Sequence, residues 1–218
     1  MTKTKEVLYK ILTRLPLAVT LTSFLFMPDE VPVHFGINNH VDRWGSKYEL
    51  LILPFVTIVI GIVFLLIARH LDKKEDNGSN NYNVMTTIGI AILGLFNILT
   101  YYILYIAFTQ VQDLDSLKID MLSLLTFTFG IVFIIIGNVV PKTKKNHFLG
   151  LRTKWSMSSE EAWKKSQRFG GYALIITGLI TIVFSLVLNG SASVFAMIMT
   201  LIVMTIVDTA YSYFASKK

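Results

Sequence analysis

The sequence has no cysteine and few charged residues, and each shortage excludes a class of protein. Without cysteine the chain can form no disulfide, no thiolate metal site and no cysteine nucleophile. Charged residues make up 16% of the 218 positions, whereas a soluble domain usually has about 25%. Because hydrophobic residues make up 53%, the composition excludes a disordered chain and disfavours a water-soluble enzyme. We expect much of the folded surface to face lipid.

Long uncharged segments predict membrane-spanning helices. A helix needs roughly 20 apolar residues to cross a hydrocarbon core of about 30 Å, and its backbone must satisfy its own hydrogen bonds there. Residues 169–207 contain no charged side chain, and the turn residues Asn189, Gly190 and Ser191 divide this stretch into two helices. The clear spans are predicted at 50–68, 84–108, 121–140, 169–188 and 192–214.

The N-terminal segment is a weaker, sixth span. The uncharged stretch between Arg14 and Asp29 is short, so a helix over 7–27 crosses the bilayer only if Lys10 and Arg14 extend to the inner headgroups. The alternative is a cleaved signal peptide, because basic residues precede a short apolar core. No small-residue cleavage site follows that core, and we therefore predict an uncleaved span.

The basic residues predict the orientation. If the N-terminus is cytoplasmic, every Lys and Arg except Arg43, Lys47 and Lys118 lies on the inner side of six spans, as the positive-inside rule requires. This predicts a multi-pass cell-membrane protein with both termini in the cytoplasm. The net charge of +6 is then mainly a topology signal. It also favours membrane lipids as partners, while direct nucleic-acid binding is not expected.

The outer loop over 28–49 has the pattern of a small β-hairpin. Val31, Val33 and Phe35 alternate with other residues before an Asn38-Asn39 turn, and alternation on either side of turn residues is typical of a hairpin. Asn tolerates the left-handed backbone conformation that such a turn needs. We therefore expect two short strands on the outer face.

His34, His40 and Asp42 in this loop are residue types that bind zinc. Their spacing fits no known metal site, and a hairpin would place the two histidines on opposite strands. We therefore favour a structural role and predict no metal and no cofactor. A catalytic site would need a convergent nucleophile, and the sequence shows none, so we predict no catalytic residue and no enzymatic activity. Asp42 and Arg43 are expected to fix the loop or to meet a ligand.

The inner loop over 141–168 is basic and is expected to be structured. Ser158 and Glu161 fit a capping box, which predicts a helix that begins near Ser159 and continues into the fifth span. Trp155 and Trp163 are suited to the membrane interface.

Asn146 and Arg152 are the residues of the inner loop that we favour for function. The planar guanidinium of Arg152 suits carboxylate, phosphate or backbone carbonyl groups. The open alternative is that Arg152 anchors the loop to a lipid phosphate or to helix-end carbonyls. Gly150, between the two, gives the backbone a permissive point.

Asp208 is the one acidic residue inside a predicted span. An ionisable group near the membrane centre costs roughly 2.5 to 3.5 kcal/mol on insertion scales, so Asp208 should face protein or water. There it could carry a proton, bind a cation or pair with a basic residue. Asn97 and Asn138 are expected to form interhelical hydrogen bonds. Glycines that share a helix face predict close packing, and these are Gly130 with Gly137 and Gly171 with Gly178.

Motifs in both loops resemble a known family. The outer loop has His34-Phe35 and residues 42–47 after Val31-Pro32-Val33. The inner loop has Gly137-Asn138, Pro141, residues 146–153 and Trp155, extended by Glu161, Trp163, Lys164 and residues 168–171. The first set resembles the N-terminal domain, and the second the C-terminal signature, of the SdpI family of bacterial membrane proteins. Departures from the family pattern occur at Asn39, Lys154 and Ser166-Gln167.

The resemblance implies a role in immunity and signalling. The family's namesake protects its producer from a secreted antimicrobial peptide toxin and, when toxin is present, holds a small winged-helix autorepressor at the membrane. The implied partners are therefore a peptide toxin outside and a winged-helix repressor in the cytoplasm. Two alternatives remain open: a small transporter or proton-coupled exporter that uses Asp208, and a membrane-surface enzyme acting on a lipid-linked or peptide substrate.

The predicted architecture is an all-α, polytopic membrane protein with six transmembrane helices, a small extracytoplasmic β-hairpin-like loop and a structured basic cytoplasmic loop. A two-span N-terminal part (1–83) and a four-span SdpI-like part (84–218) are expected to form one integrated unit. The predicted ligand or partner residues are His34, Asp42, Arg43 and Trp44 outside, and Asn138, Asn146, Gly150, Arg152, Trp155, Trp163 and Arg168 inside, with Asp208 and Asn97 as intramembrane polar residues.

Overall fold

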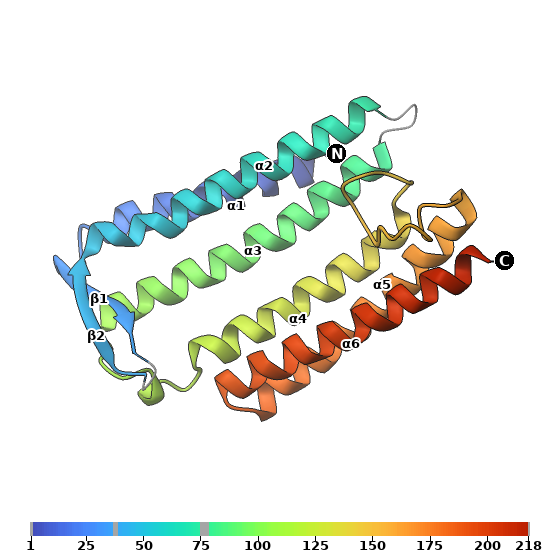
Figure 1. The fold of residues 1–218 in the computed structure, drawn as a ribbon. Coiled ribbons are helices and arrows are strands. Elements are labelled where there is room, and N and C mark those ends of the chain that lie inside the picture. Colours follow the sequence, from blue (N-terminus) through green and yellow to red (C-terminus); the bar gives the residue numbers. More distant parts are fainter. Residues whose placement is uncertain (1, 37–38, 75–78, 218) are drawn as a thin grey trace.

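The computed structural model describes residues 2–36, 39–74 and 79–217. Its long helices lie side by side along a common direction, with a small β-hairpin at one end (Figure 1). The helices are α1 (Lys3–Ser23), α2 (Ile52–Lys74), α3 (Ser79–Thr109), α4 (Met121–Val139), α5 (Glu160–Val187) and α6 (Gly190–Ser216). The strands are β1 (Glu30–Phe35) and β2 (Val41–Ser46), and short 3-10 helices occupy Lys47–Leu51, Leu114–Ser116 and Val140–Lys142.

Helices α2 to α6 are each long and apolar enough to cross a membrane, so five of the predicted spans have matching helices. They leave large apolar side chains exposed, among them Leu186 on α5, which is 70% exposed, and Ile206 on α6, which is 63% exposed. Such side chains are stable on a surface that faces lipid rather than water. The chain is a multi-pass membrane protein.

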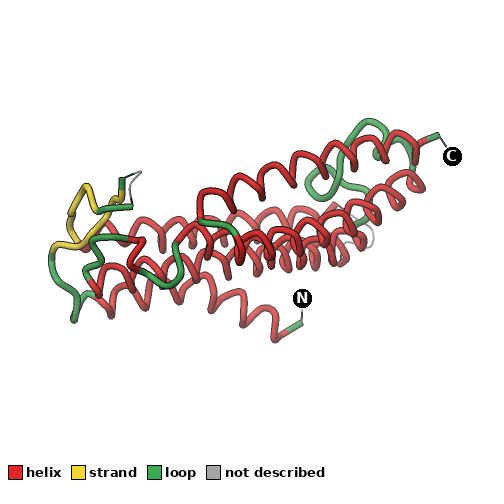
Figure 2. Tube along the Cα trace, turned by 90° about the horizontal axis from the view of Figure 1, so that it is seen from below, coloured by secondary structure: helices red, strands yellow, loops and turns green. Residues whose placement is uncertain are grey.

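Helix α1 is more polar than the other five and is not among those candidate spans, because Lys10 and Arg14 lie within it. It nevertheless packs on its neighbours. The Tyr9 hydroxyl donates a hydrogen bond to the Gly61 carbonyl of α2 over 2.6 Å, and Asn97 Nδ2 of α3 donates to the Leu12 carbonyl over 2.8 Å. Figure 2 shows α1 and α6 on opposite sides of the bundle.

The predicted bounds of this first helix were wrong by a few residues at both ends. It begins at Lys3, where the Thr2 hydroxyl accepts a hydrogen bond from the Lys5 amide, an N-cap that the expected start at residue 7 overlooked. It ends at Ser23, and the chain then turns toward the hairpin instead of continuing to Met27.

Asn97 forms three hydrogen bonds, of which the one to Leu12 joins α3 to α1. Besides Leu12, its Nδ2 reaches the Leu93 carbonyl, and its Oδ1 accepts from the Tyr101 hydroxyl over 2.9 Å. We expect Asn97→Leu to lower the free energy of unfolding by about 1 kcal/mol, the usual size of an interhelical hydrogen bond in a membrane. Thermal unfolding in detergent micelles measures this, and Tyr101→Phe, which spares the bond to α1, should have the smaller effect.

The predicted β-hairpin is confirmed. Strands β1 and β2 pair antiparallel, with Glu30 opposite Ser46 and Val31 opposite Gly45. Asn39 has the left-handed φ of 61° that was expected of the turn; its neighbour Asn38 lies outside the described residues. Because Asn tolerates this conformation better than most residues, Asn39 suits this position of the turn.

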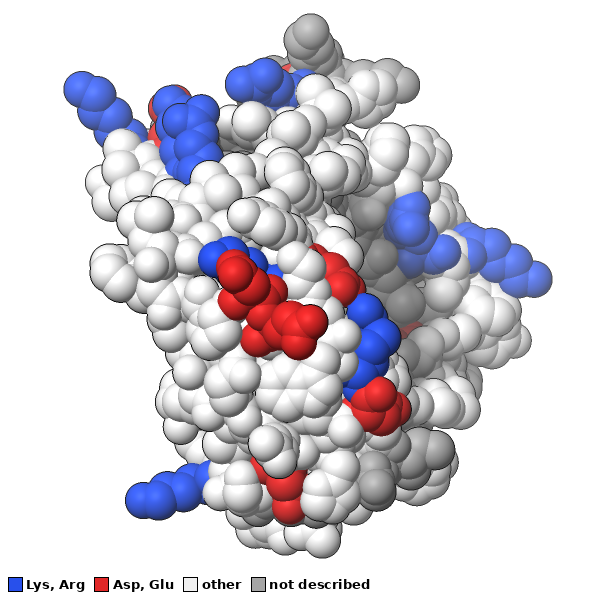
Figure 3. Space-filling model, turned by 90° about the vertical axis from the view of Figure 1, so that its left-hand side faces the viewer, with Lys and Arg blue, Asp and Glu red and all other residues white. Residues whose placement is uncertain are grey.

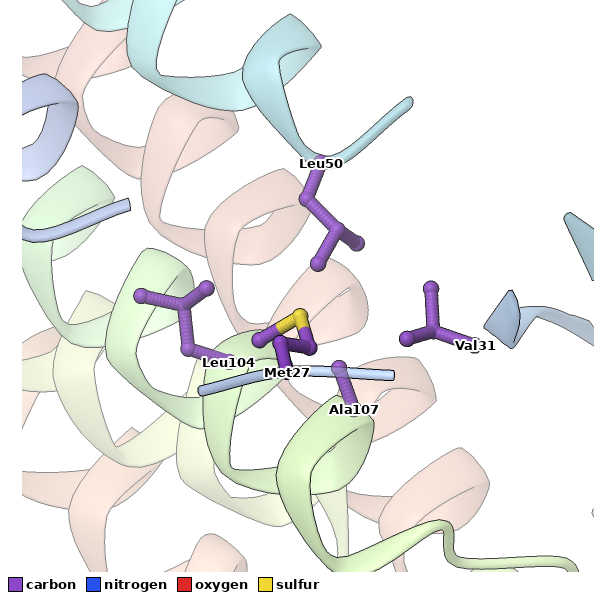
Figure 4. Close-up of a cluster of buried hydrophobic side chains, with 5 residues drawn as sticks. All are labelled: Met27, Val31, Leu50, Leu104 and Ala107. Atoms are coloured by element: carbon purple, nitrogen blue, oxygen red, sulfur yellow. The ribbon is translucent and has the colours of Figure 1, made fainter. Parts of the chain in front are cut away.

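The hairpin rests on the ends of the first three helices through one apolar cluster. Figure 4 shows Val31 of β1 beside Met27, Leu50, Leu104 and Ala107. Val31 and Ala107 are completely buried. The strand therefore contributes to the core at this end of the bundle.

Close contact of α4 with α5 depends on the glycines predicted for that role. A Cβ atom on Gly137 would lie 2.6 Å from the Gly171 carbonyl oxygen, and one on Gly130 would lie 2.8 Å from the Gly178 carbonyl oxygen. Real Cβ contacts are not this short, so the two backbones touch at both levels. The predicted turn between α5 and α6 is also confirmed, with Asn189 as the N-cap of α6.

Candidate functional site

The four predicted outer residues lie together on the hairpin. His34 Nδ1 is 2.6 Å from Asp42 Oδ1, and both side chains are exposed. Arg43 contacts both carboxylate oxygens of Glu49, at 3.2 Å and 2.9 Å. This hydrogen bond from Arg43 lowers the pKa of the Glu49 carboxyl. Trp44 is 40% exposed.

The hairpin end of the molecule exposes charged side chains of both signs and an aromatic ring. Figure 3 shows acidic and basic side chains next to one another across the hairpin end of the molecule. Trp44 adds an exposed aromatic ring of the kind that anchors peptide contacts. Within the described ranges, no three His, Cys, Asp or Glu side chains are placed to hold a metal ion.

Lys47 has a role here that the sequence did not reveal. Its side chain is only 12% exposed, and Nζ lies 2.9 Å from Asp29 Oδ1 and donates to the Phe24 and Met27 carbonyls. A cation at the last carbonyls of a helix stabilises that end. Lys47 therefore ties the 3-10 helix that follows β2 to the segment just after α1.

Replacing Lys47 should loosen this junction. We expect Lys47→Met to lower the free energy of unfolding by about 1 to 2 kcal/mol, because several hydrogen bonds to a charged group are lost. Thermal unfolding in micelles gives the value. Lys118, an exposed cation of the same end, provides the matched control Lys118→Met, and equal losses in the two variants would contradict the assigned role.

At the opposite end of the molecule, the buried Asn146 side chain bonds the backbone of the inner loop. Its Oδ1 accepts from the Phe148 and Leu149 amides over 2.8 Å and 2.6 Å, and Nδ2 donates to the Lys144 carbonyl over 2.7 Å. The side chain is 6% exposed. The amide of Asn81, at the start of α3, bonds both backbone groups of Lys144. Asn146 thus shapes the loop and presents nothing to a partner.

Gln167 and Gly150 fix the next part of the loop. Gln167 of α5 is fully buried; its Oε1 accepts from the Leu151 amide and its Nε2 donates to the Leu151 carbonyl, both over 2.9 Å. Gly150 has a φ of +85°, and a Cβ there would collide with the Gln167 side chain. Glycine is therefore required at position 150, because other residues rarely adopt this φ and because a side chain would have no space beside Gln167.

The two tryptophans of the loop have different environments. Trp163 is completely buried and its Nε1 donates to the Thr143 carbonyl over 2.9 Å, so the expected interfacial position is wrong for it. Trp155 packs edge-on against Tyr213 of α6, with Lys154 Nζ 5.1 Å from its ring centre. Trp155 stays partly exposed.

The capping box was also misplaced. Ser159, not Ser158, is the N-cap of α5, and its hydroxyl accepts from the Ala162 amide over 3.0 Å. The Ser158 hydroxyl donates instead to the Trp155 carbonyl. Glu161 instead forms an ion pair with Lys165, one turn later, at 2.7 Å. The predicted helix start and its continuation into the fifth span are confirmed.

Arg152 is exposed, and its guanidinium donates to the His147 carbonyl. This contact closes the loop on itself and leaves other guanidinium donors directed to the surroundings, because arginine has five N–H groups. Of the two residues favoured in this loop, Arg152 is therefore the one available to a partner.

Asn138 and Arg168, 30 positions apart, meet at one pocket. The pocket has a volume of about 430 Å³ and lies between the end of α4 and the start of α5. Lys142 Nζ donates to Asn138 Oδ1 over 3.5 Å. Two other lining residues are Tyr172, which the sequence did not single out, and Lys164, which belonged to the inner-loop motif but was not predicted as a site residue. Their spacing of four with Arg168 places all three on one helix face.

Asp208 faces α5 within the bundle. A Cβ on Gly170 would lie 3.6 Å from Asp208 Oδ2. Asp208 Oδ1 is buried and, in the part of the chain that is described, has no hydrogen-bond partner. The buried hydroxyl of Ser166, one turn from Gly170, is in the same situation. A buried polar atom without a partner is costly, so this is the least satisfied point of the α5–α6 contact.

Two segments of the chain, which include the inner and the outer loop, match models of known protein families. Residues 142–212 match the SdpI/YfhL protein family, and residues 11–58 match a domain of unknown function, DUF1648. The immunity protein SdpI of Bacillus subtilis is 24% identical over 218 residues, which cover 98% of this chain and 97% of that protein. An uncharacterized protein of Archaeoglobus fulgidus is 41% identical over 49 residues, which cover 22% of this chain and 27% of that protein.

No solved structure matches the chain. The segment 11–58 contains residues 11–23 of α1, the hairpin and the start of α2, and the segment 142–212 contains the inner loop from residue 142, α5 and nearly all of α6. These are the segments whose motifs carried the resemblance, and over residues 142–212 this membrane protein is similar to the SdpI/YfhL protein family.

Proposed function

We propose that the protein confers immunity to a secreted peptide toxin and acts without catalysis. The observation that carries this proposal is the similarity to the Bacillus subtilis immunity protein along nearly the whole of both chains. A resemblance restricted to one loop would support a shared module only. Similarity that includes the hairpin, the inner loop and all six helices supports a shared role.

The proposed topology has six spans with both termini in the cytoplasm. Helix α1 supports it as the sixth span, because its hydrogen bonds to α2 and α3 make it part of the bundle. Both chain ends and the inner loop lie toward the end of the bundle opposite the hairpin (Figure 1). Arg43, Lys47 and Lys118 are then the basic residues left outside, in keeping with the positive-inside rule.

Cysteine labelling tests this topology cleanly, because the chain has no cysteine of its own. Ser116→Cys places an exposed thiol at the hairpin end, and Ser158→Cys places one in the inner loop. A membrane-impermeant maleimide should label Ser116→Cys in intact cells and Ser158→Cys only after permeabilisation. The reverse pattern would overturn the orientation.

We further propose that the two ends have separate tasks. The hairpin, with Trp44 exposed and with His34 and Asp42 beside each other, would meet the toxin. The inner loop, with Arg152 exposed, would meet a cytoplasmic partner such as a winged-helix repressor. The supporting observation is that these two ends carry exposed polar side chains, namely His34 and Asp42 on the hairpin and Arg152 on the inner loop.

Paired variants distinguish the two tasks. In toxin-sensitive cells, Trp44→Ala should reduce survival while the protein remains inserted, because an exposed aromatic anchor is lost. Arg152→Ala should leave survival unchanged but abolish recruitment of a fluorescent repressor to the membrane. If Arg152→Ala recruits the repressor as well as the unchanged chain, the inner loop is not the partner site.

A second candidate function is transport coupled to a proton or cation at Asp208. It is favoured by the buried, unpartnered Oδ1 of that residue, since intramembrane acids commonly mark ion pathways. Proteoliposomes with a pH gradient should then show flux that Asp208→Asn removes and Ser216→Ala, at the end of α6, does not. Absence of flux with the unchanged chain contradicts this candidate.

A further inference from the structure

The pocket between α4 and α5 is lined by basic side chains. Asn138, Lys164 and Arg168 line it, together with Pro141, Tyr172 and Ile175. No acidic residue is among its lining residues. Within the described part of the chain, neither Lys164 nor Arg168 has an ion pair or a side-chain hydrogen bond, whereas the adjacent Lys165 is paired with Glu161 at 2.7 Å.

These cations repel one another unless an anion lies between them. Lys164 and Arg168 are four residues apart on α5, a spacing at which like charges destabilise a helix. Lys142, at the rim, adds a third positive charge through its contact with Asn138. A phosphate group has the charge and the acceptor oxygens that lysine, arginine and an amide donor would satisfy together.

The side of α5 that carries these cations continues as an apolar stripe. Tyr172, Ile176, Leu179 and Val183 follow at intervals of three or four residues and are 58%, 48%, 54% and 54% exposed. From Tyr172 to Val183 the helix rises about 16 Å, which is roughly one half of a 30 Å hydrocarbon core. The stripe therefore has the length of one lipid leaflet and begins at the pocket.

We propose that the pocket binds the phosphate of an anionic phospholipid, whose acyl chains lie along the stripe of α5. A free phosphate ion would need the cations but not the stripe, and this favours the lipid as the source of the phosphate. The proposal rests on the placement of α5 in the membrane and not on immunity, so it stands or falls separately from the proposed function.

The test measures lipid binding to the purified full chain by native mass spectrometry in neutral detergent. The probes are phosphatidylglycerol, phosphatidylcholine and inorganic phosphate. The unchanged chain should bind phosphatidylglycerol in preference to phosphatidylcholine. Lys164→Gln with Arg168→Gln should weaken phosphatidylglycerol binding roughly 10- to 30-fold, as expected from removing two cations near an anionic headgroup.

The control double variant is Lys154→Gln with Lys217→Gln. It removes the same charge from the same end of the molecule but outside the pocket, and its lipid affinity should stay within about twofold of the unchanged chain. If both double variants bound phosphatidylglycerol equally weakly, general surface charge and not the pocket would explain the binding, and the proposal would be overturned. Binding of inorganic phosphate as tight as that of phosphatidylglycerol would overturn the lipid assignment.

Tyr172→Ser provides a separate measurement on the apolar part of the site. It should weaken phosphatidylglycerol more than inorganic phosphate, because only the lipid uses the stripe. Equal effects on the two probes would contradict an acyl chain on α5. Because Lys164, Arg168 and Tyr172 are all exposed, none of these substitutions disturbs the buried core.

Discussion

Gly130→Ala combined with Gly137→Ala should lower the free energy of unfolding by about 2 to 6 kcal/mol, the sum of two overpacked sites at about 1 to 3 kcal/mol each. The new methyl groups would enter the space of the Gly178 and Gly171 carbonyls. These obstacles are backbone atoms, which cannot rotate away, so α4 and α5 would have to separate. Thermal or denaturant unfolding in micelles would show the loss as an earlier midpoint.

Gly94→Ala is the matched control, because a Cβ at that position of α3 meets nothing within 4 Å. It should leave stability unchanged or raise it slightly, since alanine favours the helix more than glycine. If the double variant behaved like Gly94→Ala, the close contact between α4 and α5 would be incorrect.

Gln167→Leu should destabilise the inner loop by about 1 to 3 kcal/mol, the cost of one unsatisfied buried group. The substitution leaves the amide of Leu151 without its partner on α5, whereas the Leu151 carbonyl still accepts from the Ser156 hydroxyl over 2.7 Å. Hydrogen exchange of loop amides in micelles should detect the effect, with faster exchange from residue 143 to residue 159 and little change in α2.

Gln112→Leu serves as the comparison, because Gln112 is exposed at the other end of the molecule. It removes the same polar group without disturbing the inner loop. Slow exchange in the inner loop of Gln167→Leu, matching that of Gln112→Leu, would show that Gln167 does not fix this segment.

Local patterns in the sequence predicted the elements whose cause is local. Alternating apolar residues around Asn39 were sufficient for the hairpin, because a turn and two short strands depend on neighbouring residues. The glycine pairs predicted the α4–α5 contact, since a spacing of seven places both members on one helix face. The uncharged segments predicted the helices, but not all of their ends: α1 shifted at both ends, α2 continues to Lys74 and α3 begins already at Ser79, because helices extend beyond their uncharged parts.

Residues that act across long separations could not be predicted in this way. The contact of Lys47 with the Phe24 carbonyl spans 23 positions, and that of Asn81 with Lys144 spans 63. Trp163 was expected at the interface because tryptophan commonly lies there, but tertiary packing buries it completely. Such partners become visible only once the helices are placed beside one another.

The candidate site residues also divide into those placed by local structure and those placed by contacts between distant parts of the chain. His34 and Asp42 were predicted to belong to one surface, and a single hairpin brings them into contact. The inner candidates separate instead into Asn146, Gly150 and Trp163, which build the loop, and Arg152, which stays exposed. Asn138 and Arg168 join in a pocket because α4 and α5 pack closely, which is a property of the glycines between them.

Survival of toxin-treated cells tests the central claim most directly. Bacillus subtilis cells that lack SdpI are exposed to the peptide toxin against which SdpI protects, with and without expression of this chain, and insertion is verified by maleimide labelling of Ser116→Cys. The account predicts that cells with the inserted chain keep growing at toxin concentrations that kill the vector control. Equal killing of both, with the chain correctly inserted, would contradict the claim that it is an immunity protein.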